Sequence, residues 1–260
     1  MYLAMSIAAT GLRHQQFRID TIAHNVANVN TVAHKSARLD FKDALYTTGL
    51  TPGPPRTPHP EGNQQKGHGV MVAGIGRDFR SGNFETTNRP MDFAIQGEGF
   101  FSLSDFNGEL VYTRNGSFHI SVEEDGNYLV NGEGFYVLDE DGERIMLPFG
   151  MTTMNVGQDG SLQFRIGDEI VGETRLGIFT FRNLYGLESV GGANYFQDPA
   201  AGERLEAEGI RVFQGVLEMS NVNLAEEMTR LIRTQRAFQL ASRALTTADD
   251  MEGIANNMRR

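Results

Sequence analysis

The six histidines of this 260-residue sequence are the residues best suited to metal binding or acid–base chemistry. His14, His24 and His34 stand ten residues apart, which rotates each by about 280° on a helix, so they share no face. The sequence contains no HExxH segment and no two histidines at i and i+4. Zinc needs several ligands that converge on one point. We therefore interpret the histidines as surface residues and predict no metal site.

Two short segments resemble ligand-binding loops. Gly97-Glu98-Gly99 resembles the start of a dinucleotide fingerprint, but it lacks the third glycine and opens a strand rather than a helix. The segment 139–142 (DEDG) lacks the spaced ligands and closing glutamate of a calcium loop. There is no P-loop, no GxSxG elbow and no cysteine. We predict no catalytic residue, no cofactor and no small-molecule substrate.

The acidic residues leave an enzymatic alternative open. Residues 49–215 hold 24 of the 33 acidic residues but 12 of the 23 basic ones. A pair of carboxylates facing each other across a cleft would indicate a glycoside hydrolase, although the sequence singles out no such pair. A monomeric binding module is a further alternative. Because no basic stripe remains to meet phosphates, we expect no nucleic-acid binding.

Glycine and proline divide the chain into three parts. All eight prolines and 28 of the 30 glycines lie between residues 49 and 215. Both residues are costly inside helices, so long helices are expected at the two ends and short strands in the middle. We predict an α+β fold, in which the N- and C-terminal helices pack as a coiled-coil-like pair beside a mainly antiparallel all-β middle domain. The expected segments are an N-terminal helical assembly segment, an irregular linker, a β-rich domain and a C-terminal helical assembly segment, over residues 1–35, 36–80, 81–215 and 216–260.

Apolar residues near the N-terminus recur with a heptad period. One series occupies every seventh position and a second lies three residues after each member, with one polar exception. The two series are Met5, Leu12, Ile19 and Val26, and Ala8, Gln15, Ile22 and Val29. This pattern predicts a helix over residues 3–29.

The C-terminal segment has the same organisation. Asn223 can accept hydrogen bonds from first-turn amides, and Glu226 can reach back to close a capping box. The apolar series is Leu224, Leu231, Phe238 and Leu245, and its small companions are Ala241, Ala248 and Ala255. We predict a helix over residues 224–257. Neither helix can bury its stripe alone, so the two are expected to pack together.

The middle of the chain alternates short apolar runs with Asn-Gly and Asp-Gly pairs, which are typical of hairpins. We expect a meander, sandwich or partial barrel with strands over residues 100–103, 110–113, 118–120, 128–130, 135–138 and 174–181. Phe100 and Phe101 are expected in its core. Tyr112 and Arg114 are interpreted either as contacts to neighbouring subunits or as ordinary strand surface. The proline-rich stretch 49–63 is expected to form no helix or ladder.

Targeting signals are weak. No run of 18 apolar residues occurs, so no segment reads as a membrane span. The first ten residues lack a basic stretch followed by a long apolar one, and therefore do not predict a cleaved signal peptide.

Several ordered motifs resemble the flagellar basal-body rod and hook proteins. Residues 23–31 (AHNVANVNT) are similar to that family's ANNLANVxT signature, and residues 220–238 are similar to its SNVNxAEEM…TQRAF segment. Residues 95–118 are similar to its I.G.GFF…YTR.GSF body. This chain departs from the family at Ala33-His34, where Gly-Phe is usual, and at His24, where Asn is usual.

The resemblance implies a structural subunit of the distal rod, with the proximal rod subunit as the alternative. It implies polymerisation into a helical tube that transmits torque from motor to hook and carries exported subunits. The implied partners are further copies of the chain, proximal rod and hook subunits, the flagellar export apparatus, and outer rings acting as a bushing. The implied location is the rod in the periplasmic space, reached without a cleaved signal peptide.

The predicted assembly residues lie on or beside the two helix stripes. On the N-terminal side they are Leu12, Ile19, Ile22, Asn25, Val26, Asn28 and Val29, and on the C-terminal side Asn221, Asn223, Leu224, Leu231, Gln235, Phe238, Leu245 and Ala248. Asn25 and Asn28 either set the register through side-chain hydrogen bonds or cap the helix end.

Overall fold

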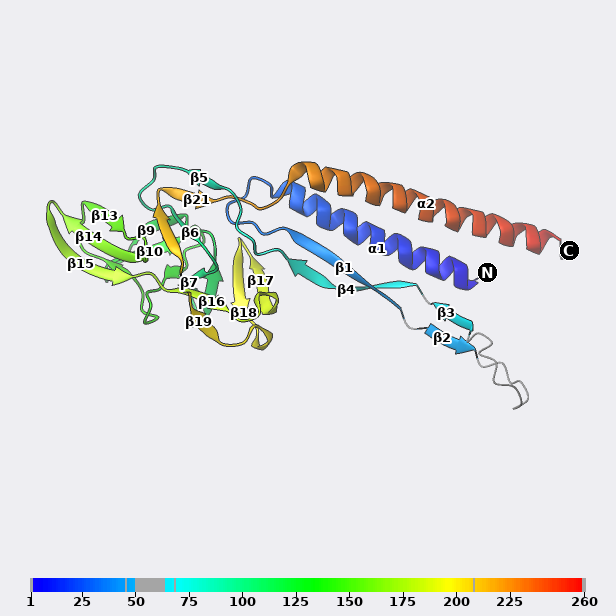
Figure 1. Cartoon of the computed structure of the whole chain (residues 1–260), viewed down its shortest axis with the longest axis horizontal. Helices are drawn as coiled ribbons and strands as arrows, with labels where there is room; N and C mark the ends of the chain where they lie inside the picture. The colour runs from blue at the N-terminus through cyan, green and yellow to red at the C-terminus, as the bar shows by residue number, and fades with distance from the viewer. Residues whose placement is uncertain (1, 45, 50–63, 68, 208, 259–260) are drawn as a thin grey trace. The chain divides into compact units, whose positions relative to one another are not determined.

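The computed structural model describes residues 2–44, 46–49, 64–67, 69–207 and 209–258 (Figure 1). The chain divides into two compact units, each assembled from segments that are distant in sequence. The terminal unit comprises residues 1–27, 37–76 and 223–260, and the β unit comprises residues 28–36 and 77–222. The chain therefore passes between the two units four times.

Two helices dominate the terminal unit. They are α1 (Tyr2–Ala27) and α2 (Leu224–Asn257), and they lie side by side along their length (Figure 1). The predicted helix pair is therefore confirmed. The helix α2 has the predicted bounds, whereas α1 ends at Ala27, two residues before the predicted end.

The heptad stripes form the seam between the helices. Every described member of the two N-terminal series that lies within α1 is buried or half-buried. On α2, Leu231, Phe238 and Leu245 are half-buried, as are the three companion alanines. Glu227 and Thr234 extend the companion series toward the start of α2, and each is only 3% exposed. The seam of α2 is thus polar at one end and alanine-lined at the other.

A β ribbon completes the terminal unit. Strand β1 (Ala37–Asp43) pairs with β4 (Val70–Arg77), and β2 (Tyr46–Gly49) pairs antiparallel with β3 (Gln64–Gly67). This corrects the expectation of an irregular linker over residues 36–80. Packing explains the difference, because Phe41 of β1 lies against α1, with its ring 6.0 Å from that of His14. The predicted proline-rich stretch covers residues 49–63. Residues 50–63 lie outside the described part of the chain, and Gly49 is the last residue of β2.

The β unit is built from short strands and two 3-10 turns. Its strands are β5 (Phe84–Thr86), β6 (Phe93–Gln96), β7 (Phe100–Ser104), β8 (Leu110–Thr113), β9 (Phe118–Val122), β10 (Asn127–Asn131), β11 (Tyr136–Val137), β12 (Met146–Leu147), β13 (Thr153–Val156), β14 (Ser161–Ile166), β15 (Glu169–Arg175), β16 (Ile178–Phe181), β17 (Leu187–Gly191), β18 (Asn194–Gln197), β19 (Arg204–Glu206), β20 (Arg211–Gln214) and β21 (Val216–Glu218). The turns are η1 (Leu184–Gly186) and η2 (Pro199–Ala201).

The largest described sheet runs in the order β12-β10-β11-β7-β8-β18-β17, and β9, β16 and β19 pair beside this path. A separate antiparallel sheet is β13-β14-β15, and β20 pairs with β6 and β21 with β5. The predicted antiparallel character is confirmed. The hairpin predicted at Asn115-Gly116, between residues 110–113 and 118–120, is wrong. Strand β8 pairs with β7 and β18, while β9 pairs with β10. A Cβ at Gly116 would lie 1.8 Å from the Phe93 carbonyl oxygen. Glycine is therefore required at this point, where the two backbone segments approach closely.

The predicted strand over residues 174–181 is interrupted. Strand β15 ends at Arg175 and β16 begins at Ile178, with Leu176 and Gly177 between them. The amide of Gly177 donates to the Leu138 carbonyl, and its own carbonyl accepts from Ser102. The chain therefore changes partners at this point instead of continuing one strand.

The core of the β unit is aromatic and fully enclosed. Phe101 packs edge-on against Phe118, with ring centroids 5.3 Å apart, inside a large cluster of aliphatic residues. A second cluster joins Phe100 with Tyr112 and Tyr195. Phe100 and Phe101 are 2% and 0% exposed, which confirms their predicted place in the core.

Candidate assembly site

The helix seam already occupies most of the residues predicted for assembly. Leu12, Ile19 and Val26 are half-buried on α1, and Ile22 and Asn25 are buried. The predicted residues that are half-buried on α2 are Leu231, Phe238, Leu245 and Ala248, and the exposed ones are Leu224 and Gln235. Asn223, which precedes α2, is exposed as well. The half-buried residues therefore pack within the chain, and Leu224 and Gln235 remain accessible on α2.

A second set of apolar residues, which the heptad analysis missed, lies off the seam and faces solvent. On α2 the fraction exposed reaches 66% at Leu240 and 59% at Ile254. Six of these residues, which lie on α2 or just after it, form what we call the outer apolar face, and Ile7 and Phe17 are exposed on α1; the six are Met228, Ile232, Leu240, Met251, Ile254 and Met258. Large apolar side chains gathered on exposed helix surface are a mark of interaction sites. The sequence alone could have identified these residues, because they are apolar but occupy positions outside the two heptad series of each helix.

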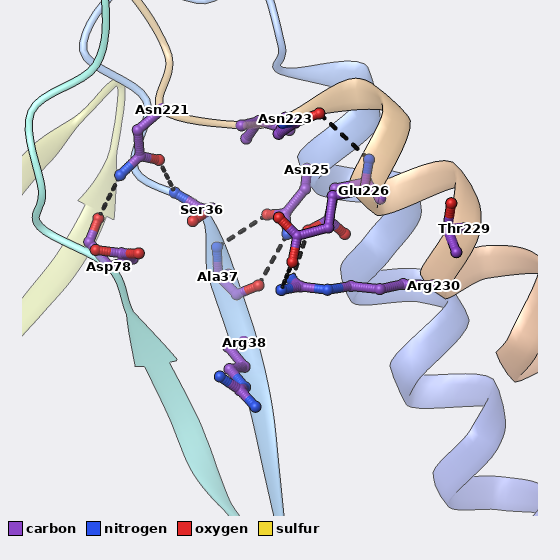
Figure 2. A network of polar contacts seen from close by, with 12 residues as sticks. Asn25, Ser36, Ala37, Arg38, Asp78, Asn221, Asn223, Glu226, Thr229 and Arg230 are labelled. Carbon is purple, nitrogen blue, oxygen red and sulfur yellow. Dashed lines mark hydrogen bonds and ion pairs between the residues drawn. The ribbon is translucent and has the colours of Figure 1, made fainter.

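Asn25 fastens the end of α1 to the ribbon. Its side-chain amide donates to the Ala37 carbonyl at 2.8 Å, and its side-chain oxygen accepts from the Ala37 amide at 2.9 Å (Figure 2). The Asn25 side chain thus makes to Ala37, the first residue of β1, the same pair of hydrogen bonds that the backbone of a neighbouring strand would make. Neither predicted interpretation, register along the seam or a helix cap, describes this contact.

Three further predicted assembly residues lie in the turns beside the helices. Asn28 and Val29 follow the last residue of α1, and Asn28 accepts from the amide and the hydroxyl of Thr31 in a turn. Asn221 precedes α2. Its oxygen accepts from the Ser36 amide at 2.8 Å, and its nitrogen donates to the Asp78 carbonyl at 2.7 Å (Figure 2). Both asparagines act in the turns that flank the helices, since the Asn28 side chain accepts from the Thr31 hydroxyl and the Asn221 side chain satisfies backbone groups.

The start of α2 is capped as predicted, with one difference. Asn223 accepts from the amides of Ala225 and Glu226, which confirms its role as the N-cap (Figure 2). Glu226 does not close a capping box, since its carboxylate accepts from Arg230 at 2.5 Å. The same guanidinium donates to Glu227 at 2.7 Å. Two acidic residues in the first turn also suit the positive end of the helix dipole.

A buried ionic cluster lies within the β unit. Lys35 Nζ is 2.7 Å from Glu218 Oε1, and Arg114 Nε is 3.2 Å from Glu218 Oε2. The side chains of these three residues are 1–3% exposed. The Gly82 amide also donates to Glu218, and the Lys35 ammonium donates to the Arg80 carbonyl. We call Lys35, Arg114 and Glu218 the clasp.

The positions of Arg114 and Tyr112 contradict both predicted interpretations, a subunit contact and an ordinary strand surface. Arg114 donates to the carbonyls of Gly97 and Gly99 at 2.8 and 2.6 Å, so it lies neither on the strand surface nor at a subunit contact. Tyr112 is 0% exposed in the aromatic cluster. The segment 97–99, which resembles a nucleotide loop, thus turns its carbonyls toward a cation of the same chain.

Burial shapes the ionisation of the clasp. Loss of hydration lowers the pKa of Lys35, and the neighbouring charge of Glu218 opposes that shift. Burial likewise lowers the pKa of Arg114, again against the effect of Glu218. Desolvation of a charge is costly unless ion pairs and hydrogen bonds replace the lost water. The shared carboxylate and the three backbone carbonyls supply that replacement.

Residues 28–36, which we call the strap, bind to the segment that leads into α2. The Ala33 amide donates to the Glu218 carbonyl at 2.8 Å, and the Asn221 amide donates to the His34 carbonyl at 3.3 Å. Ala33 is fully buried with φ at +57°, a left-handed conformation that glycine adopts at little cost. The strap therefore belongs structurally to the β unit, although it follows α1 in sequence.

The described residues contain no metal-binding cluster. Among them, no three or more histidine, aspartate or glutamate side chains gather where they could hold a metal ion. The Asp139 carboxylate accepts from the Glu143 amide at 2.8 Å, as expected of a hairpin turn. Neither helix of the described chain is long and apolar enough to cross a membrane.

Three family models match separate parts of the chain. The model described as "Flagella basal body rod protein" matches residues 5–35, and "Flagellar basal body rod FlgEFG protein C-terminal" matches residues 214–258. The model "Flagellar hook protein FlgE/F/G D1 domain" matches residues 94–164. The first match ends at the clasp lysine, and the second includes Glu218 and Asn221.

Curated proteins are similar over the whole length. A "Flagellar basal-body rod protein FlgG" of Borreliella burgdorferi is 38% identical, with 100% of both chains aligned. Another protein of that name, from Agrobacterium fabrum, is 35% identical over 97% of this chain and 98% of its own. The "Flagellar hook-basal body complex protein FlhP" of Bacillus subtilis is 30% identical, with 100% of both chains aligned.

Proposed function

The chain belongs to the flagellar basal-body rod protein family, and from this premise we propose that it is a distal rod subunit that polymerises through the outer face of its helix pair. In this proposal, copies of the chain form a helical tube that transmits torque from motor to hook and lets exported subunits pass. Relatives named FlgG, the distal type, support the distal rod over the proximal rod.

The outer apolar face carries this proposal. Most residues of the heptad stripes pack within the chain, yet the six large side chains of the outer apolar face remain exposed. Burying such surface against neighbours stabilises association by roughly 25 cal/mol per Å² before the entropic cost of association is subtracted. Repeated contacts between different faces of identical chains generate helical assemblies. A helix pair with an internal seam and an apolar exterior suits that mode of growth.

Further parts of the proposal concern partners and location. We assign the subunit to the rod within the periplasmic space, where it meets proximal rod subunits, hook subunits and the outer rings acting as a bushing. It reaches that place through the flagellar export apparatus. It acts without catalysis, and the segments 1–35 and 216–260 make the assembly contacts.

The substitution Leu240→Glu tests the proposal. Leu240 is the most exposed apolar side chain of α2, and its neighbour Gln239 is also exposed and can serve as a control. The substitution places a charge on the outer apolar face and leaves the seam intact. We expect loss of rod assembly and motility, measured by electron microscopy of basal bodies and by swimming, with unchanged helix content of the purified subunit. The matched control is Gln239→Glu, which adds the same charge at the neighbouring exposed position.

The two variants separate the possible outcomes. Normal rods from Leu240→Glu would overturn the role of the outer face. A loss of helix content in the same variant would show that Leu240 stabilises the subunit itself. Equal loss of assembly in both variants would show that charge anywhere on α2 is disruptive, and would remove the support for an apolar contact.

A further inference from the structure

We propose that residues 28–36 form a strap that closes the β unit in the last step of its folding, and that the ion cluster of Lys35, Arg114 and Glu218 is the clasp that locks it. This inference concerns the folding of the single chain and does not rest on the proposed place in the rod.

The first step of the argument is the pattern of strap contacts. Each of four consecutive residues, 33–36, binds the segment 218–221 through a backbone hydrogen bond or an ion pair. The strap also reaches the segment 78–80, where Lys35 donates to the Arg80 carbonyl and the Asp78 amide donates to the Ser36 carbonyl. The strap is therefore held from two sides by segments that belong to the rest of the β unit.

The second step concerns the site that receives Lys35. Glu218 is the last residue of β21, and its pairing with β5 positions its backbone without the strap. Ala33 of the strap later adds a bond at the Glu218 carbonyl. Arg114 and the Gly82 amide contact its carboxylate independently of the strap. The receiving site is thus assembled by the β unit before the strap arrives. Lys35 then adds the second cation and the contact to Arg80.

The third step is energetic. A lysine that is 1% exposed must find its carboxylate, because an unpaired buried ammonium is strongly destabilising. A strap shifted by one residue would bury a different side chain and leave Glu218 with one cation fewer. The clasp therefore favours one register of the strap over its neighbours, as buried polar groups do in other packed interfaces.

The fourth step is kinetic. The Lys35–Glu218 and Ser36–Asn221 contacts join residues 183 and 185 positions apart. By contrast, β7 pairs with β8, β9 with β10 and β14 with β15 across short turns. Contacts of high sequence separation pay loop-closure entropy first and form late unless they belong to the folding nucleus. A chain whose residues beyond 216 are missing cannot form the clasp at all.

The test is a set of folding and unfolding rates for the full-length chain. Stopped-flow tyrosine fluorescence suits it, because the chain has no tryptophan and the β unit buries Tyr112 and Tyr195 completely. We expect Lys35→Met to accelerate unfolding by about 100-fold or more and to change the folding rate less than about twofold, as for a contact absent from the transition state. Arg182→Met, which removes an exposed cation of the same unit, should change neither rate appreciably.

Two further variants keep the test decisive. Asn221→Ala removes the bonds to Ser36, Asp78 and Arg80 but retains the ion cluster, and should accelerate unfolding by roughly tenfold, so it serves if Lys35→Met does not fold. Leu103→Ala, in the β7–β8 hairpin, should slow folding, because local strands form early. A folding rate that falls with Lys35→Met or Asn221→Ala as strongly as with Leu103→Ala would overturn the proposal. Unchanged unfolding rates in both strap variants would also overturn it.

Discussion

The two units of this chain bury their side chains very differently. Within the described terminal unit, Ile22 and Leu39 are the only hydrophobic side chains that are buried. The β unit encloses two aromatic and aliphatic clusters and shields a group of charges as well. The β unit thus carries its own core, whereas the terminal unit has a thin seam and an apolar exterior.

This difference indicates where each unit obtains its stability. A helix with one stripe gains most of its stability from tertiary packing, and two helices cover only one side of each other. The remaining apolar surface of the terminal unit is available to other chains. We expect the β unit to remain folded in a monomer and the terminal unit to depend on neighbours for its full stability.

Removal of α2 is expected to have the largest effect of all. A chain ending at Asn223 loses half of the seam and the whole outer apolar face but keeps Glu218 and Asn221. We expect complete loss of rod assembly and motility, while the near-ultraviolet circular dichroism of the β unit persists. Normal rods from this truncation would contradict the assembly role of α2. A vanished near-ultraviolet signal would contradict the independence of the β unit.

Truncation of one packed side chain in each unit compares how much packing stabilises the two units. Phe101→Ala should lower the free energy of unfolding of the β unit by about 3–5 kcal/mol, because its side chain is fully enclosed. Leu231→Ala in the seam should cost the purified monomer about 1 kcal/mol, because the side chain is only half-buried. Denaturant titrations followed at 222 nm and in the near ultraviolet separate the two units. Equal losses would mean that the seam is as well packed as the core.

Ala33 sharpens the assignment of the strap to the β unit. Ala33→Val puts a β-branched side chain at φ +57° in a fully buried position and should cost about 2–4 kcal/mol. Ala33→Gly relieves the left-handed conformation but loses a buried methyl group, so its stability should stay within about 1 kcal/mol of the parent chain. Both effects should appear in the near-ultraviolet transition. A shift confined to the helical signal would instead place the strap with the terminal unit.

The predictable features of this fold are the local ones. Heptad spacing is a property of neighbouring turns, so Leu12, Ile19 and Phe238 identified the seam without knowledge of the partner helix. Arg114 was misjudged because its burial depends on Glu218, a partner that no local pattern reveals. The same holds for Lys35, whose contact spans 183 residues. The ribbon strand β1 was missed because its packing on α1, through Phe41 and His14, decides its conformation.

The smallest expected effect is the response of the β unit to alkali. Burial raises the pKa of Tyr112 and of Tyr195, and the nearby Arg204 and Arg77 oppose the two shifts. In the unfolded chain these phenols lose their protons near pH 10, whereas the folded chain retains them. The unfolded state then binds fewer protons, so the free energy of unfolding should fall as pH rises above about 10.

Lys35 works in the opposite direction, which makes the alkaline response a test of the clasp. Its lowered pKa means that the folded chain releases this proton first, so its contribution to stability rises with pH until the unfolded lysine also titrates near 10.5. Tyr112→Phe/Tyr195→Phe should therefore turn the falling profile flat or rising, and Lys35→Met should steepen the fall. Denaturant titrations between pH 8 and 11 measure both in the near ultraviolet, where the buried phenylalanines of the β unit still give a signal in the double tyrosine variant. A Lys35→Met profile that parallels the parent chain would show that Lys35 has the same pKa in the folded and unfolded chains, so that Glu218 fully offsets the desolvation of the ammonium that distinguishes the β unit from the terminal unit.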